Sequence, residues 1–576
     1  MRLGILSVGL LVGLMASLID APVAHAGGVE LPSAGTRALG RGGAAQARAD
    51  DPMTLLWNPA GLARTPGIQL SLQTHLILYD ACFQRFGTYG EYAGDMPSRD
   101  MIDASGEEFR WDRAANGGRT RSLMDPEIGS RYDSSPVSDL PLPEVCNSGR
   151  PQVVPNLVLT ARLTPEWGFA FGLVAPAAVG NTRWGRSEGG VQGIVNGLPA
   201  PSRYALIEED LLIAFPTIGV AYRPHPAVSI GAAFGWGVAP SIQFTTITRA
   251  VRGEDFANDV LTELDAADWF VPRVTASVHV VPHDNIDIVA SFMWQDDIRA
   301  EGDLTLTTGY YRPADDDYPL DQATVPGVTV DAPLPWQAGL SFRYADRITP
   351  RHDNPDAQSR LTNRVEDSMQ NERWDIELDL VYEMNSRVDQ FTVLLPPCPS
   401  TAACDPRGRW EVQADNGLFQ GIPPDISLQK QWRDQLSLRV GGDWNFIPGV
   451  GSARLGFSYE TKGIKDGFEQ LDILPLQRFG LHLGLTFRIA KWFDISVAYA
   501  RIFQSTTTVS EDRASLHQTT AETRIGEIET CGEDPAPGTC SRMDRQGTFG
   551  EGTVINAGTY KSHFDILSLG LTYHFR

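Results

Sequence analysis

The chain has 576 residues, a formal net charge of -23 at pH 7 and 42% hydrophobic residues. This charge disfavours nucleic acid as a partner, because binding to phosphates requires a surplus of Lys and Arg. Beyond the N-terminus, no stretch approaches the roughly 18 consecutive apolar residues of a membrane-spanning helix. The mature protein is therefore predicted to be either soluble or a transmembrane barrel.

The first 26 residues have the pattern of a secretory signal peptide. Arg2 precedes an uncharged apolar run over residues 3–19, and residues 24–26 (Ala-His-Ala) provide a small-x-small cleavage site. The alternative, a membrane anchor, requires a spanning run of about 20 residues, which is longer than this one. We expect cleavage after residue 26 and export of the remaining chain.

Neither the cysteines nor the acidic segments form a recognisable metal-binding motif. An even number of cysteines in an exported protein indicates disulfides, and there is no Cys-x-x-Cys or Cys/His cluster. Residues 314–321 (ADDDYPLD) are typical of a solvated loop; carboxylates are ligands that Ca²⁺ prefers, but this segment lacks the EF-hand spacing. No cofactor or metal is predicted. The six cysteines are Cys82, Cys146, Cys398, Cys404, Cys531 and Cys540.

The C-terminal part alternates with a period of two. From Phe479 to Ile489 every second residue is Phe, Leu or Ile, whereas the intervening residues are Gly, His, Thr and Arg. A soluble sandwich also alternates, but its strands are short. Long strands with an apolar face, an Arg- and His-bearing face and aromatic ends are typical of an outer-membrane barrel. The chain ends on a similar strand at Phe575, followed by one extra residue, Arg576.

Fourteen such segments predict an all-β, 14-stranded antiparallel transmembrane barrel, an even number as bacterial barrels require. Short links alternate with seven long ones, as expected for periplasmic turns and external loops. The cysteines fall in the first, fifth and seventh long loops as three same-loop candidate pairs, although spacing does not prove pairing. Residues 345–373 break the alternation, either as an insertion or through an error of register. The predicted strands are 68–79, 153–163, 168–175, 211–223, 228–246, 269–281, 286–304, 328–344, 374–395, 431–446, 453–462, 479–490, 494–507 and 563–575.

Four stretches resemble the FadL/TodX-type outer-membrane transporters of long-chain fatty acids and other hydrophobic compounds. They are GTRALGRGGAAQARADDPMTLLWNPAGLA from Gly35, SRYALIEEDLLIAFPTIGVAYRPHPAVSIGAAFGW from Ser202, LPWQAGLSFRY from Leu334 and VINAGTYKSHFDILSLGLTYHF from Val554. The resemblance implies a hatch inside the barrel, a kinked third strand that opens a lateral hole, and passive uptake gated by ligand-induced hatch movement. It divides the chain into a signal peptide (1–26), a hatch (27–66) and a barrel (67–576).

The hatch residues of interest are small or polar. Glycines permit close packing against the wall, and Asn-Pro favours a turn before the first strand; a purely structural plug is the alternative reading. The named positions are Arg37, Gly40, Gly42, Gly43, Asp50, Asp51, Asn58, Pro59, Ala60 and Gly61.

Two further groups concern the cargo. The substrate-lining candidates are Leu55, Leu56, Trp57, Phe169, Phe171 and Val174, although the last three alternate and are also compatible with facing lipid. The lateral-gap candidates are Gly172, Ala175 and Pro176, since Pro cannot donate to a ladder and Gly weakens one; ordinary strand termination is the alternative.

The expected cargo is a long-chain fatty acid, although no motif places a base for its carboxylate, and Arg387 and Arg249 are only guesses. A neutral aromatic or aliphatic hydrocarbon stays open, as does a surface barrel with adhesive or structural loops and no transport. Scattered histidines predict no catalytic constellation, so no enzyme is expected. The other expected partners are outer-membrane lipid and lipopolysaccharide, around a monomer.

Overall fold

The structure is a computed structural model, and most of the barrel wall lies within its described residues. No helix in this described part is long and apolar enough to cross a membrane. The signal peptide, residues 314–321, Pro176, Cys531 and Cys540 lie outside it. The described residues are 35–87, 110–111, 121–122, 141–175, 181–188, 191–196, 198–249, 259–308, 310, 322–348, 367–399, 404, 410–413, 418–421, 425–517, 522–525, 529–530, 541–542 and 554–575.

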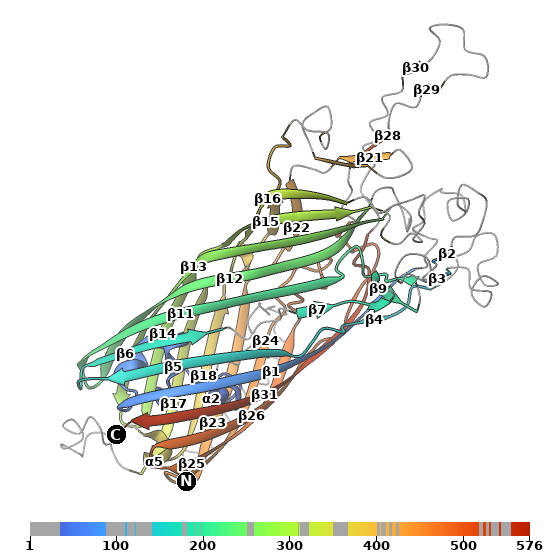
Figure 1. Ribbon diagram of the computed structural model, residues 1–576. Helices are drawn as coiled ribbons and strands as arrows, with labels where there is room; N and C mark the ends of the chain where they lie inside the picture. Colours follow the sequence, from blue (N-terminus) through green and yellow to red (C-terminus); the bar gives the residue numbers. More distant parts are fainter. Residues whose placement is uncertain are drawn as a thin grey trace.

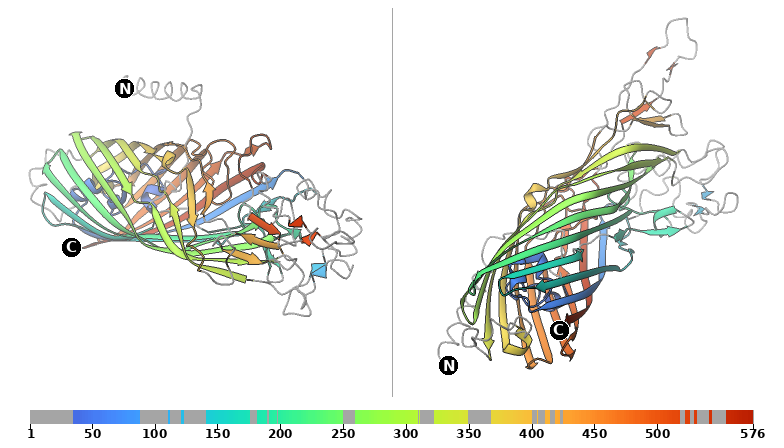
Figure 2. Two further views of the ribbon diagram at one scale, coloured as in Figure 1. Left: turned by 90° about the horizontal axis from the view of Figure 1, so that it is seen from above. Right: turned by 60° about the vertical axis from the view of Figure 1, so that its left-hand side comes forward.

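One antiparallel sheet closes on itself as a 14-strand barrel, which confirms the predicted fold class (Figures 1 and 2). Strand β1 pairs with β31 on one side, from Ile68 opposite Phe575 to Arg85 opposite Gly558, and with β5 on the other. Closure satisfies the backbone groups that an open edge would expose. The wall is formed by β1 (Ile68–Arg85), β5 (Gln152–Arg162), β6 (Trp167–Val174), β11 (Glu208–His225), β12 (Val228–Arg249), β13 (Asp259–His283), β14 (Ile286–Gln295) with β15 (Ile298–Thr307), β17 (Gln337–Arg347) with β16 (Gln322–Ala332), β18 (Glu372–Glu383) with β19 (Gln390–Leu394), β23 (Gln435–Ile447) with β22 (Asp425–Gln429), β24 (Gly451–Glu460), β25 (Arg478–Ala490), β26 (Phe493–Gln504) with β27 (Thr507–Val509), and β31 (Gly558–Phe575).

The shorter elements lie inside the barrel, in the external loops and at one rim. The helical elements are α2 (Thr36–Leu39), α3 (Thr54–Trp57), η1 (Pro59–Ala63), α5 (Ser368–Asn371) and η4 (Asn385–Arg387). The remaining strands are β2 (Arg110–Trp111), β3 (Arg121–Ser122), β4 (Val145–Cys146), β7 (Asn181–Arg183), β8 (Arg186–Glu188), β9 (Val191–Val195), β10 (Leu198–Pro199), β20 (Glu411–Gln413), β21 (Leu418–Gly421), β28 (Glu522–Ile525), β29 (Glu529–Thr530) and β30 (Ser541–Arg542).

The outer face of the barrel is apolar along most of its length. On β25, Leu481 and Leu483 are more than half exposed, whereas His482 between them is fully buried toward the lumen. The same alternation runs along β6, β18 and β31. An apolar outside around a polar inside is the arrangement of a barrel surrounded by hydrocarbon.

Five wall strands are each divided into two segments, which the sequence pattern does not reveal, and one of these breaks, at residues 505–506, separates β26 from β27. The predicted strands 286–304, 328–344 and 374–395 break at residues 296–297, 333–336 and 384–389, and β22 and β23 are separated by residues 430–434. Pro333 and Pro335 have no N–H to donate to the ladder, which accounts for one of these breaks.

Beyond the breaks, the side chains that face inward are mostly apolar and those that face outward are mostly polar or charged. In β15 the inward side chains join an apolar cluster with β13, β16 and β19, while charged side chains cover the outer face. An outer surface of this kind suits water, so this part of the wall projects past the apolar band. On β15, Ile298, Ala300 and Leu304 are buried and Arg299, Glu301 and Asp303 are exposed.

The loops that close the external end are tied by disulfides. Cys82 is bonded to Cys146 across 64 residues, here named the first-loop disulfide, and Cys398 is bonded to Cys404. Two of the three candidate pairs are thereby confirmed. Apolar side chains of several loops pack together beside the first-loop disulfide, including Trp184 and Leu206.

The long link at residues 345–373 is an insertion, not an error of register. Its described ends meet where Ile348 N donates to Asn371 O at 2.7 Å. Met369 of α5 is buried, and its carbonyl accepts from Gly449 N in the short β23–β24 turn. The two described ends of the link therefore lie at the same end of the barrel as the short turns.

Candidate functional site

Residues 35–66, here named the inner segment, lie inside the barrel. None of them is exposed, although only α2, α3 and η1 are regular. In Figures 1 and 2 their blue ribbons lie within the ring of strands. Gly42, with φ of 69°, would place a Cβ 2.8 Å from backbone atoms of Phe457 in β24, so only glycine permits this approach.

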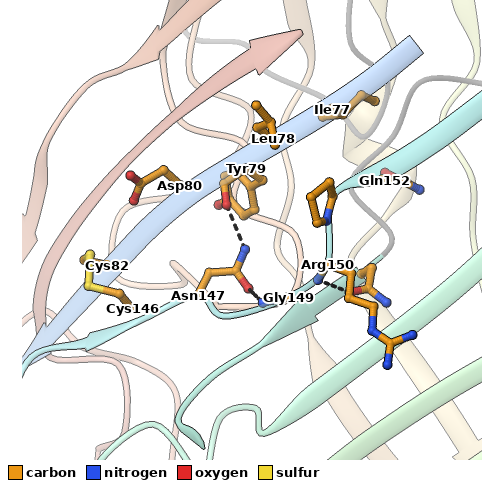
Figure 3. Close-up of a pocket in the computed structure, with 12 residues that line it drawn as sticks. Ile77, Leu78, Tyr79, Asp80, Cys82, Cys146, Asn147, Gly149, Arg150 and Gln152 are labelled. Atoms are coloured by element: carbon orange, nitrogen blue, oxygen red, sulfur yellow. Dashed lines mark hydrogen bonds between the residues drawn. A yellow bond between two sulfur atoms is a disulfide. The ribbon is translucent and has the colours of Figure 1, made fainter. Parts of the chain in front are cut away.

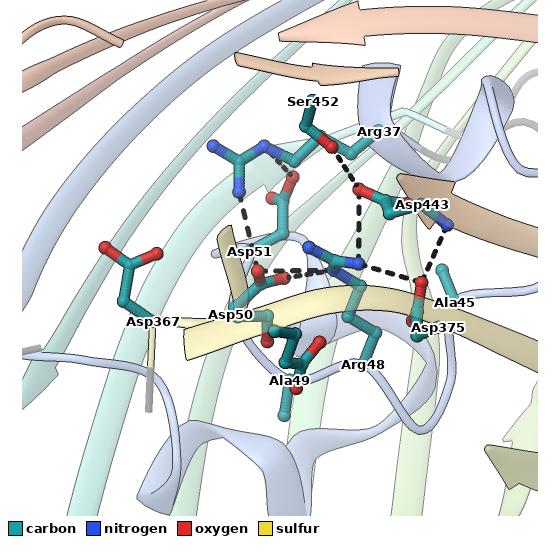
Figure 4. A network of polar contacts seen from close by, with 12 residues as sticks. Arg37, Ala45, Arg48, Ala49, Asp50, Asp51, Asp367, Asp375, Asp443 and Ser452 are labelled. Atoms are coloured by element: carbon teal, nitrogen blue, oxygen red, sulfur yellow. Dashed lines mark hydrogen bonds and ion pairs between the residues drawn. The ribbon is translucent and has the colours of Figure 1, made fainter. Parts of the chain in front are cut away.

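One side of the inner segment is held by ion pairs to β18 and β23. The Arg41 guanidinium, fully buried, lies 2.9 Å from carboxylate oxygens of both Asp375 and Glu377 and also pairs with Asp443. Arg48 pairs with Asp375 at 3.2 Å and with Asp443 at 3.1 Å (Figure 4). These contacts are charge-assisted and buried, so breaking one leaves an uncompensated charge in the lumen.

A second ionic group joins the inner segment to β26. Arg37 Nη2 lies 3.0 Å from Asp494 Oδ2 of β26, and its guanidinium lies 3.9 Å from Asp50 and 3.8 Å from Asp51. Burial raises the pKa of Asp50, but Arg48 and Arg37 outweigh burial and hold it well below the ordinary value. The three predicted charged hatch residues are therefore brought together in one network.

The Asn58-Pro59-Ala60-Gly61 stretch forms the predicted turn into the wall. Asn58 Nδ2 donates to Gln46 O at 2.7 Å, and Asn58 Oδ1 accepts from Ser277 Oγ of β13 at 2.9 Å. The Ala60 N–H donates to the same Ser277 hydroxyl at 2.8 Å. Gly231 of β12 faces the Pro59–Ala60 backbone, where a Cβ would lie 2.4 Å from it.

The remaining glycines of the inner segment have different surroundings. A Cβ on Gly40 would lie 2.9 Å from the Cα of Gly484, and one on Gly61 would lie 2.6 Å from the Thr54 hydroxyl. Gly43 adopts a φ of 80° and is half-buried. Close approach to the wall is thus clear for Gly40 and Gly42, whereas Gly61 packs within the segment itself.

The other side of the inner segment is apolar and faces β6, β11 and β12. Leu55 and Leu62 are buried in one cluster with Val158, Val174 and Phe215, and Leu56 and Trp57 pack at its margin. A Cβ on Gly172 would lie 3.1 Å from Leu55. The segment thus has an ionic side and an apolar side on different parts of the wall.

Two of the predicted substrate-lining residues are misplaced. Phe169 and Phe171 lie on the outer face of β6, with 40% and 56% of their surface exposed, whereas Val174 faces inward. The period-two alternation of β6 turns both phenylalanines away from the lumen. They are therefore not candidates for contact with a ligand inside the barrel.

The ladder of the third wall strand, β6, ends at Val174. Up to that point it is regular: Gly172 is paired with Thr217 of β11 and with Val158 of β5. The next amide, Ala175 N, donates to the Asn156 side chain at 2.9 Å instead of to a strand. In the described part of the chain, pairing with β11 resumes only at β7, with Asn181 opposite Asp210.

Sequence reasoning missed the carboxylates of the wall that receive the inner segment. Asp375, Glu377 and Asp379 occupy alternate positions of β18, and Asp379 accepts from Ala45 N at 3.0 Å. An alternating acidic row on a barrel strand was the available signal. Glu209 of β11 was also missed; it is 8% exposed, and its Oε2 has no hydrogen-bond partner.

The two guessed carboxylate-binding bases receive no support. Arg387 donates to Leu334 O, and its Nη2 lies 3.3 Å from Asp297, so its charge is already compensated. The side chain of Arg249 lies outside the described residues.

The fold and this site define a class of protein: a closed antiparallel barrel whose lumen contains the N-terminal part of its own chain. Solved structures with this fold include a FadL homologue from Pseudomonas aeruginosa, 13% identical, with a TM-score of 0.58 over 95% of this chain and 100% of the other. The toluene transporter TodX of P. putida is 13% identical, with a TM-score of 0.55 over 95% and 100% of the two chains. The toluene transporter TbuX of Ralstonia pickettii is 12% identical, with a TM-score of 0.50 over 95% and 99%.

The resemblance inferred from the sequence is confirmed at the level of the fold, which this chain shares with those transporters. No family model and no curated protein matches the sequence.

Proposed function

We propose that this protein is an outer-membrane barrel through which hydrophobic molecules pass passively, with the inner segment as gate and release into the membrane at the end of β6. The observation that carries the proposal is the two-sided attachment of the inner segment. Its ionic side is anchored on β18 and β23, whereas Leu55 on its apolar side packs in one cluster with Val174, where the β6 ladder ends. Apolar contacts at that place can be exchanged for an apolar ligand without separating charges.

Release into the membrane suits such cargo energetically. Burial of each CH₂ group contributes about 0.8 kcal/mol, so exit into water would cost a long alkyl chain many kcal/mol, while passage into lipid costs little. This difference favours lateral release and requires no energy source.

The charge of the interior bears on which cargo fits. Among the described residues, the buried charged side chains comprise 17 Asp or Glu and 11 Arg or Lys. A fatty acid carboxylate would enter a region that already has a surplus of carboxylates, including Glu209, whose Oε2 has no hydrogen-bond partner. Long-chain fatty acids, the cargo predicted from the sequence, are therefore less favoured than uncharged hydrophobic molecules; two of the structures with this fold are described as toluene transporters.

Uptake by cells distinguishes transport from a surface barrel with adhesive or structural loops. We would compare labelled toluene and labelled oleate in Gram-negative cells with and without the protein. Faster toluene uptake than in cells without the barrel supports the proposal, and slower uptake is expected for Leu55→Asp, which places a charge on the apolar side. If uptake of both compounds equals that of cells without the barrel, transport is refuted and the adhesive or structural role is the remaining hypothesis.

A further inference from the structure

The barrel wall has an interruption between β1 and its neighbour near the external end. The β1–β5 ladder runs as far as Ile77 opposite Gln152, and pairing resumes only with Cys82 opposite Cys146 of β4. Between these two points, residues 78–81 of β1 face the turn 147–151, which leaves the ladder. This place differs from the end of β6 discussed above.

A single residue, Asn147, bridges the interruption with its backbone and its side chain, and its N–H donates to Ala81 O at 2.7 Å. Asn147 Nδ2 donates to Tyr79 O at 2.9 Å, and Asn147 Oδ1 accepts from Gly149 N at 2.9 Å and from Arg183 N of β7 at 3.0 Å. The first-loop disulfide involves the preceding residue and fixes the turn on β1. The turn is thus held open at a defined distance from the strand, so the space beside it is preformed.

That space is a pocket of about 530 Å³, shown in Figure 3. Its volume is within the range of small-molecule sites. Its lining combines apolar side chains with three amides and includes Ile77, Leu78, Pro151, Asn147, Gln152 and Asn181. Amides both donate and accept hydrogen bonds, so they suit an uncharged polar group such as a hydroxyl.

The pocket lies where the apolar outer band of the wall ends. Leu72 and Leu78 on the outer face of β1 are 48% and 39% exposed, and the next outward residue, Asp80, is charged. On the neighbouring strand the band ends with Val153, 62% exposed. A molecule dissolved in the outer leaflet therefore reaches the pocket from the lipid side.

The charges at the margin of the pocket are mixed. Asp80 lies 3.9 Å from the imidazole of His563, and Arg150 of the turn is exposed. Because acidic and basic groups are both present, a charged ligand gains little binding free energy over a neutral ligand of the same shape.

We propose that this wall pocket binds an uncharged amphiphile, with its alkyl or aryl body against Leu78 and Pro151 and its hydroxyl-type group at the amides of Gln152 and Asn181. The proposal rests on the proposed function, because passage of hydrophobic molecules is what brings such ligands to the barrel. It adds a membrane-facing binding site to the path through the lumen. It also specifies that the bound molecule has an uncharged polar group at one end.

The test measures equilibrium binding of labelled 1-dodecanol to the full-length mature protein in phosphatidylcholine nanodiscs, with empty nanodiscs subtracted. Leu78→Trp fills the pocket from an exposed position, and Leu72→Trp makes the same change on the same face of the same strand away from it. We expect Leu78→Trp to weaken binding by at least about tenfold and Leu72→Trp to leave it unchanged, a difference of the size that pocket contacts supply. Heat-modifiable gel mobility checks that both variants fold.

Two more measurements sharpen the outcome. Gln152→Leu should reduce the preference for 1-dodecanol over dodecane and over dodecanoate. Equal weakening by both tryptophan variants, wild-type binding in Leu78→Trp, or loss of dodecanol binding when lipopolysaccharide is added would overturn the proposal, the last because lipid chains would then be the occupant. Binding that is lost in Leu78→Trp while cells show no uptake would refute the transport function but not the pocket.

Discussion

Removal of the Arg41 guanidinium should detach the ionic side of the inner segment. In Arg41→Met the carboxylates of Asp375, Glu377 and Asp443, all fully buried, lose the cation that they share. Removing one partner of a buried charge network costs about 3–5 kcal/mol. Since about 1.4 kcal/mol corresponds to a tenfold change, the equilibrium for detachment should shift by about two to four orders of magnitude.

Hydrogen exchange of the inner-segment amides measures this shift directly. The Ala47 N–H donates to Glu377 Oε1 at 2.6 Å and should lose protection in step with detachment. Arg373→Met is the matched control, because the Arg373–Asp346 pair is exposed and contributes at most about 1 kcal/mol. Arg41→Lys should be intermediate, since an ammonium keeps the charge without the planar fork. Wild-type protection of Ala47 in Arg41→Met would refute the assignment of the anchor.

Three other outcomes follow from the same contacts. In Gly456→Ala the new Cβ would lie 2.0 Å from the backbone carbon of Arg41, so inner-segment amides should lose protection while wall strands keep theirs; unchanged exchange would contradict the close packing. Burial raises the pKa of Asp50, but Arg48 and Arg37 lower it further, so its stabilisation is complete above the ordinary value of 3.8 and is lost only as the pH falls through the lower folded value. Asp50 should therefore contribute no change in inner-segment protection between about pH 7 and pH 5, and a decline in that interval would show that another group controls it. Reducing the first-loop disulfide, which closes 64 residues, should destabilise the external end by about 4 kcal/mol in the chain-entropy description and speed proteolysis of the first loop; equal cleavage rates would exclude this.

Much of the wall was predictable because it depends on local alternation. The apolar positions of β25 and β31 recur every second residue, and period two alone assigns them to one face. The same rule identifies all fourteen wall strands near their observed positions. The period-two rule does not find the breaks at 296–297 and 333–336. Beyond each break the apolar residues still recur at every second position, but the face of the strand that carries them has changed from outward to inward.

The candidate site was predictable only in part. The small residues around Gly42 and the turn at Asn58 were visible in the sequence, as was Arg37. The partners of these residues were not visible in the sequence. Closure of the whole sheet sets the strand registers, and these registers place Ser277 opposite the turn and end the β6 pairing at Val174.

The sequence by itself determined the number of wall strands and the alternation of link lengths, since each is encoded over a few neighbouring residues. It also placed Cys82 with Cys146 and Cys398 with Cys404 in common loops, without proving that they pair. Only the tertiary structure decided what the inner segment touches. Arg41 meets Asp375 across 334 residues of chain and Asp443 across 402. Such contacts depend on how a closed, tilted sheet brings distant strands around one lumen, and no local period contains that information.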